Sequence, residues 1–257
     1  MLYLTTISCV SYTLSTLCQA QRLFSTPGSS SSYFFRLGSL VSLFSHGYLL
    51  YILIETPGGQ NLHSLILLSL IFWLLNITIF LSVHLVKVEN LALFAYPLTT
   101  LVLIVSLIYP GKDIIQTNAF SGMVSHIFLS LLATSTLCLA FFQAILLSVQ
   151  NYYLKHRTPS AILKLLPPLQ TMESLLFIFL WSGSVLLSLA LISGLWFQYN
   201  HPALAHTPEI LLSVFSWLII VVLLIGRYKL GWRSQKAVIG TTLGFALIFI
   251  SYFGTHI

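Results

Sequence analysis

Histidine is the residue type best placed to carry chemistry in this chain of 257 residues. His46 and His126 lie well inside long apolar runs, His63 lies at the start of one, and His201 and His206 lie close to such runs. A neutral imidazole nitrogen is a good axial ligand for haem iron, which an apolar helical pocket can enclose. A single histidine on an apolar helix more often hydrogen-bonds to a neighbouring helix than binds a metal. The residues alone leave both interpretations open.

The acidic residues, in contrast, do not point to catalysis. All five carboxylates fall at the ends of apolar runs or between them: Glu55, Glu89, Asp113, Glu173 and Glu209. A carboxylate within a membrane helix would mark a proton or cation path, because a charge in hydrocarbon is costly and is kept for a function. The sequence also lacks the H-E-x-x-H and G-x-S-x-G motifs of hydrolases. We therefore expect neither an enzyme nor a proton-driven pump.

The composition indicates a membrane protein. Apolar residues make up 57% of the chain and charged residues only 6%, which leaves too little polar surface for a soluble globule. Eight apolar runs have about the length of roughly 20 residues that a membrane helix needs. The predicted spans are 2–20, 37–54, 62–84, 91–109, 122–148, 174–197, 210–226 and 237–256. We predict a single all-α domain over 1–257, a polytopic bundle of eight transmembrane helices.

The basic residues predict how these helices are oriented. Ten of the eleven Lys and Arg residues fall in the gaps after the odd-numbered runs: Arg22 and Arg36; Lys87; Lys155, Arg157 and Lys164; Arg227, Lys229, Arg233 and Lys236. The other gaps hold only Lys112. Because basic loops stay in the cytoplasm, both termini should lie outside, on the periplasmic face. His126 and His201 would then lie near the outer face.

The charge distribution also bears on partners and on processing. The net charge of +6 is spread over short loops, where anionic lipid headgroups neutralise it, so we expect membrane lipid and no nucleic acid as a partner. No Lys or Arg precedes the first run, and Cys18-Gln19-Ala20-Gln21 is a poor cleavage site. We therefore expect the first helix to be retained.

Several motifs occur in a recognisable order along the chain. They are Gln60-Asn61-Leu62, the segment Gly122-Met123-Val124-Ser125-His126-Ile127-Phe128-Leu129-Ser130, Leu166-Pro167-Pro168-Leu169, Met172-Glu173-Ser174-Leu175, Ile192-Ser193-Gly194-Leu195-Trp196, Gly231-Trp232-Arg233-Ser234-Gln235-Lys236 and Ser251-Tyr252-Phe253-Gly254. With eight helices in this orientation, their order resembles the integral-membrane cytochrome c assembly family. This family comprises haem-handling proteins, among them the CcsA-like and HemX-like branches.

The resemblance implies a protein that holds haem b non-covalently near the outer face of the bacterial inner membrane. Its role would be in cytochrome maturation or haem-linked regulation, with haem and other cytochrome-maturation or membrane proteins as partners. His126 occupies the place of the histidine that opens the fifth helix in this family, where it is regarded as a haem ligand. His46 or His201 would supply the second ligand.

Two departures from the family pattern favour an alternative. Haem-presenting members carry a W-G-x-x-W-x-W-D segment between the sixth and seventh helices, whereas this chain reads Trp196-Phe197-Gln198-Tyr199-Asn200-His201-Pro202 there. The histidine expected near the end of the seventh helix is replaced by Leu224-Ile225-Gly226-Arg227-Tyr228. The alternative is a non-catalytic structural or regulatory partner of another membrane protein, without bound haem. A small-solute transporter also remains open.

Overall fold

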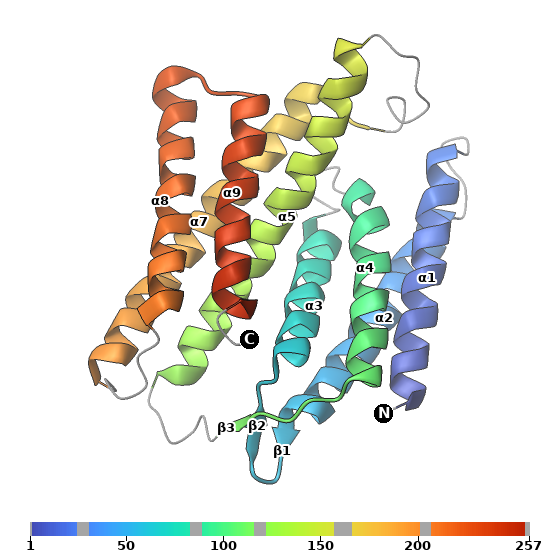
Figure 1. Ribbon diagram of the computed structural model, residues 1–257. Helices are drawn as coiled ribbons and strands as arrows, with labels where there is room; N and C mark the ends of the chain where they lie inside the picture. Colours follow the sequence, from blue (N-terminus) through green and yellow to red (C-terminus); the bar gives the residue numbers. More distant parts are fainter. Residues whose placement is uncertain are drawn as a thin grey trace. The chain divides into compact units, whose positions relative to one another are not determined.

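The computed structural model describes residues 2–24, 31–82, 89–115, 122–156, 166–200 and 207–254. Eight long helices account for most of these residues (Figure 1). They are α1 (Leu2–Phe24), α2 (Ser31–Ile54), α3 (Ser64–Ser82), α4 (Glu89–Ile108), α5 (Met123–Lys155), α7 (Leu169–Asn200), α8 (Thr207–Leu230) and α9 (Gln235–Phe253). Within this part of the chain, all of them except α1 are long and apolar enough to cross a membrane. The predicted all-α polytopic membrane bundle is confirmed.

Several helices extend beyond the predicted spans: α2 begins at Ser31 rather than 37, α7 covers Leu169–Asn200 rather than 174–197, and α8 covers Thr207–Leu230 rather than 210–226. In α1, ten of the 23 residues are Ser, Thr, Gln or Arg, which lowers its hydropathy, so an eighth crossing stays a prediction. Helix α5 continues beyond the predicted 122–148 to Lys155, through the polar residues Gln150 and Asn151. Gln150 Nε2 donates to the Pro167 carbonyl at 2.9 Å. Such tertiary partners satisfy side chains that a hydropathy pattern assigns to a loop.

A small antiparallel sheet was not predicted. It has the order β1-β2-β3, formed by β1 (Glu55–Thr56), β2 (Gly59–Asn61) and β3 (Ile114–Ile115). The side-chain amide of Asn61 stabilises this sheet. Asn61 Oδ1 accepts the Asp113 N–H at 2.9 Å, and Asn61 Nδ2 donates to the Gly111 carbonyl at 3.1 Å. The sheet joins the loops that follow α2 and α4. Strands of two or three residues are too short to show a hydrophobic period.

The chain forms two compact units, residues 1–120 and 121–257. In the first unit, α1 and α3 each pack against both α2 and α4. In the second unit, α5 and α8 each pack against both α7 and α9. Each unit therefore has its own core, built from a four-helix arrangement of the described helices. The interpretation of 1–257 as one domain stays a prediction.

Buried polar side chains connect the helices of the first unit. Asn76 of α3 donates to the Thr99 hydroxyl of α4 at 2.8 Å. The Tyr96 hydroxyl of α4 donates to Ser39 of α2 at 2.9 Å. Lipid tails are as apolar as leucine, so burial alone gives little drive for helices to associate inside a membrane. Hydrogen bonds such as these two set which helix faces meet.

Glu173 organises one end of the second unit. The residue is only 6% exposed. Its Oε1 accepts the Ser234 backbone N–H at 3.0 Å, and its Oε2 lies 4.0 Å from Arg227 Nη1. The Arg227 guanidinium lies 4.7 Å above the centre of the Phe177 ring, and Asn151 Nδ2 donates to the Ser234 hydroxyl at 2.8 Å. These contacts join α5, α7 and α8 to the start of α9.

Substitutions at Glu173 test this role. The Glu173→Gln variant keeps an oxygen for the Ser234 N–H but loses the charge that faces Arg227, whereas Glu173→Ala loses both. Removing the acceptor of a buried donor costs about 1–3 kcal/mol. We expect thermal stability in detergent to fall in the order wild type, Gln, Ala. The exposed Glu55→Gln is the control and should unfold like the wild type. Wild-type stability in Glu173→Ala would contradict this role.

Cysteine labelling tests the predicted orientation in both units. Lys112 and Lys155 are exposed positions expected on the outer and inner face respectively. In spheroplasts, a membrane-impermeant maleimide should label the Lys112→Cys variant and should label Lys155→Cys only after detergent opens the membrane. The unsubstituted protein, with its three natural cysteines, gives the background. The reverse labelling pattern would contradict external termini.

Candidate functional site

His126 lies one turn inside the start of α5. The residue before this helix, Gly122, has a φ of 84°, a left-handed backbone conformation that glycine adopts without strain. The Gly122 carbonyl accepts the His126 backbone N–H at 3.0 Å and the Ser125 hydroxyl at 2.8 Å. This turn starts the helix at Met123 and so determines where the His126 imidazole projects.

The imidazole of His126 is oriented by α7. Its Nδ1 lies 3.1 Å from the Ala190 carbonyl oxygen and 3.1 Å from the Ser193 hydroxyl oxygen. A carbonyl oxygen can only accept, so Nδ1 must carry the hydrogen. The Ser193 hydroxyl donates to the same carbonyl at 2.9 Å, which leaves its oxygen free to accept from Nδ1 as well. In the neutral ring, Nε2 is then the nitrogen with a lone pair.

Within the described part of the chain, no residue hydrogen-bonds to the lone-pair nitrogen, His126 Nε2, and the side chain is only partly buried. The ring lies against Gly194, where an added Cβ would stand 2.8 Å from the imidazole Cε1. Trp196, two residues further along α7, is 58% exposed and packs against Gly122. The site therefore presents an oriented imidazole nitrogen near the end of α7 that also carries the exposed side chain of Trp196.

His46 has a different environment. It is fully buried in α2. Its Nδ1 lies 3.2 Å from the Tyr12 hydroxyl of α1, and its Nε2 lies 2.9 Å from the Ser69 hydroxyl of α3. Both ring nitrogens are therefore occupied by hydrogen bonds to neighbouring helices. Of the two interpretations that the sequence allowed for a histidine on an apolar helix, these contacts correspond to the hydrogen bond with a neighbouring helix. A ligand role for His46 stays a prediction.

The remaining histidines named from the sequence are His63, His201 and His206. His201 and His206 lie outside the described residues. His63 belongs to the first unit, where its Nδ1 lies 3.5 Å from Asp113 Oδ2. Among the described residues, no group of three or more His, Cys, Asp or Glu side chains could hold a bare metal ion. A haem differs from such an ion because its porphyrin already supplies four nitrogen ligands.

Sequence reasoning missed the residues that hold the imidazole. Ala190, Ser193 and Gly194 contact His126, and only the last two lie in the quoted motif Ile192–Trp196, to which no role had been assigned. The spacing of these residues along one helix does not predict a contact with a histidine 64 to 67 positions away. From the sequence alone, the two segments were therefore not placed in one site.

The fold and this site define a polytopic α-helical membrane protein that presents an oriented imidazole close to a helix start. The chain belongs to the cytochrome C assembly protein family, whose sequence model matches residues 33–257. It is similar to the inner membrane protein YpjD of Escherichia coli K12, with 29% identity over 223 residues, 86% of this chain and 84% of that protein. YpjD of E. coli O6:H1 and of O157:H7 match to the same extent. No solved structure matches.

The hydrogen bond to Ala190 predicts the tautomer of His126. Protein labelled with ¹⁵N-histidine, prepared without haem in micelles at neutral pH, should show His126 protonated at Nδ1. Long-range correlations between ring nitrogens and carbon-bound protons distinguish the two tautomers, and the His126 signals are those lost in a His126→Gln variant. A ring protonated at Nε2 would contradict the assigned geometry.

Proposed function

We propose that this protein binds haem b through His126 Nε2 and serves cytochrome c assembly or related haem handling in the bacterial inner membrane. The supporting observation is the pair of Nδ1 contacts to Ala190 and Ser193, which leaves Nε2 without a partner among the described residues. Histidine ligands in metal sites usually donate their second nitrogen to a carbonyl or carboxylate, which orients the ring and raises its basicity. His126 already has this arrangement.

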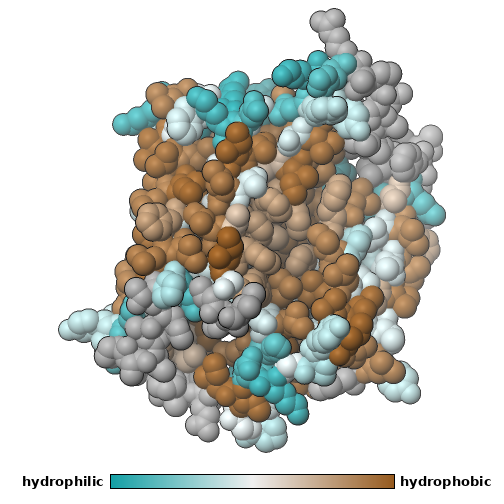
Figure 2. Space-filling model, in the orientation of Figure 1, coloured by the Kyte–Doolittle hydropathy of each residue, from teal (hydrophilic) through white to brown (hydrophobic). Residues whose placement is uncertain are grey.

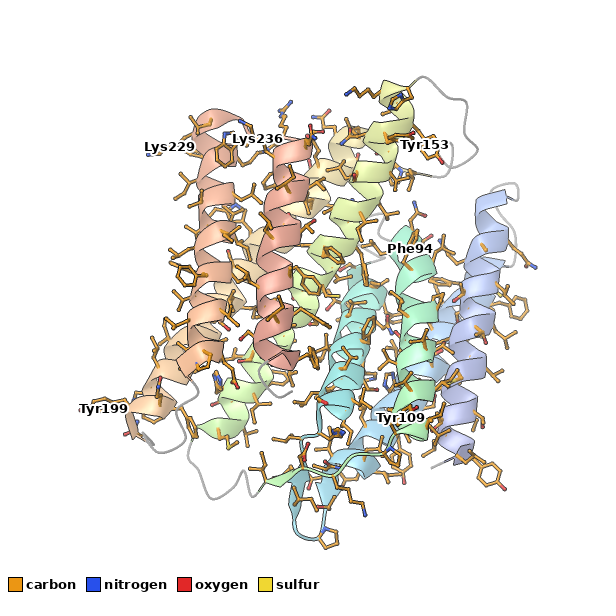
Figure 3. All side chains as sticks on the ribbon, viewed as in Figure 1. Phe94, Tyr109, Tyr153, Tyr199, Lys229 and Lys236 are labelled. Atoms are coloured by element: carbon orange, nitrogen blue, oxygen red, sulfur yellow. The ribbon has the colours of Figure 1, made fainter. Side chains whose placement is uncertain are left out.

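The surroundings of His126 suit a flat, largely apolar cofactor. Trp196 offers an exposed aromatic face next to Gly122, and Tyr199 lies further along the same end of α7 (Figure 3). Aromatic side chains pack well against ring systems. Bound haem would supply the iron chemistry, while the chain would hold and orient it and carry out no bond-making reaction itself.

For the second axial ligand, we propose His201 ahead of His46. His201 directly follows Asn200, the last residue of α7, so it follows the same helix end that carries Trp196. His46 would first have to release the hydrogen bond to Ser69 or the one to Tyr12. In this proposal His46 is a contact between helices of the first unit, and His126 is the primary ligand.

The rival function is a structural or regulatory partner of another membrane protein that binds no haem. The specific observation in its favour is the full hydrogen bonding of His46, since one of the two intramembrane histidines then serves helix packing alone. In this case His126 would likewise be a contact between α5 and α7. The two functions differ in whether the protein carries iron.

Absorption spectra of the purified protein test the proposal. Wild type from haem-replete membranes should show a Soret band that His126→Ala abolishes or shifts. Gly194→Ala should weaken haem affinity by roughly 10- to 100-fold, because its Cβ displaces the ring that the Ala190 carbonyl orients. Ser193→Ala should have a smaller effect, since that carbonyl remains, and the exposed His156→Ala is the neutral control.

Two results would count against it. An unchanged Soret band in His126→Ala would remove this residue from the site. A wild-type protein without iron or Soret absorbance would favour the rival function.

A further inference from the structure

An apolar groove runs between α8 and α9 in the second unit. Its volume is about 430 Å³, and its lining includes Leu218, Val222, Leu223, Trp232, Lys236 and Ile239. Leu223 is 2% exposed and forms the floor, whereas Val222 and Ile239 are 53% and 52% exposed and form the walls. The groove is therefore open toward the surroundings of the bundle, which for a membrane helix pair means lipid.

The groove fits within one lipid leaflet. Its lining on α8 runs from Leu218 to Leu223, and Gly226, against which Trp232 packs, lies eight residues after Leu218. At 1.5 Å per residue these eight residues extend about 12 Å along the helix. Half of a hydrocarbon core of about 30 Å is about 15 Å. An acyl chain of the leaflet on that side could lie along the groove with its headgroup at the α8–α9 loop.

The headgroup end of the groove is pre-organised. The Trp232 ring lies against Gly226, where an added Cβ would meet its Cε3, and the Trp232 N–H donates to the Gly226 carbonyl at 3.1 Å. The Lys236 ammonium lies 5.0 Å from the centre of the Trp232 ring. A cation at this distance from an aromatic face is attracted to it. Lys236 is therefore held at the mouth of the groove.

Three exposed basic residues at this end form no ion pair with a carboxylate among the described residues. They are Lys229, Arg233 and Lys236. Glu173 is the nearby acidic residue, but it is buried and bound to Ser234 and Arg227. Lys229 and Lys236 stand at the same end of α8 and α9 (Figure 3), where the brown apolar surface changes to teal (Figure 2).

We propose that this groove is a binding site for one anionic phospholipid. An acyl chain lies between α8 and α9 along Val222, Leu223 and Ile239. The phosphate lies at Lys236, with Arg233 adding positive charge from the same loop. An apolar groove that ends in exposed cations is complementary to a lipid with an apolar tail and a negative headgroup. The basic loop is the one that the charge pattern assigns to the cytoplasmic face.

Native mass spectrometry of the full-length protein tests the site. The lipids are dioleoyl-phosphatidylglycerol, which is anionic, and dioleoyl-phosphatidylcholine, which has the same tails without net charge. We expect wild type to retain one phosphatidylglycerol in preference to phosphatidylcholine. Lys236→Gln should weaken phosphatidylglycerol binding about five-fold, the effect of one basic residue near a lipid surface. Lys236→Arg keeps the cation and should bind like the wild type. Val222→Trp fills the groove and should weaken the binding of both lipids.

The matched control is Lys155→Gln, which removes one exposed charge at the end of α5, outside the groove. Equal losses of phosphatidylglycerol in Lys155→Gln and Lys236→Gln would overturn the proposal, because net charge alone would then explain the binding. Equal binding of the two lipids by wild type would also overturn it. The proposal would also be overturned if the wild type formed a dimer and Val222→Trp dissociated it, because the groove would then be an interface with a second copy. None of these results depends on whether haem binds at His126.

Discussion

A polar group inside a lipid bilayer has to find its hydrogen-bond partner within the protein, and both units are organised by this constraint. In the first unit, His46 reaches Tyr12 and Ser69 on two neighbouring helices. In the second, the buried Ser216 hydroxyl of α8 donates to the Gly244 carbonyl of α9 at 2.7 Å. Leucine and isoleucine fill the remaining space, but they are equally well solvated by lipid. The polar contacts therefore select which helix faces meet.

The same constraint separates the two intramembrane histidines. His46 has a partner at each ring nitrogen, so its polar groups are satisfied by protein alone. His126 has partners at Nδ1, and no described residue bonds to its Nε2. The two histidines both lie within apolar runs, but only His126 has a ring nitrogen without a hydrogen-bond partner among the described residues. This difference supports the proposed ligand role of His126.

The two ends of the second unit carry different chemistry. At one end the Gly122–Ser130 motif meets Ile192–Trp196 through His126 and Gly194. At the other end Met172–Leu175 meets Gly231–Lys236 through the hydrogen bond from Ser234 to Glu173. That bond also holds the loop that presents Trp232 and Lys236 to the groove between α8 and α9. Motifs that are far apart along the chain are therefore in contact in pairs, with one pair at each end of the second unit.

The sequence by itself determined the membrane class, the approximate helices, the family and His126 as the leading ligand candidate. These depend on hydropathy, on charge in the loops and on the order of motifs, all of which are local or linear properties. Only the tertiary structure decided that α5 continues past Gln150, that short strands pair around Asn61, and that His46 is fully hydrogen-bonded. Each of these depends on a partner from a distant segment, and no local pattern records which polar atoms will meet once the helices pack.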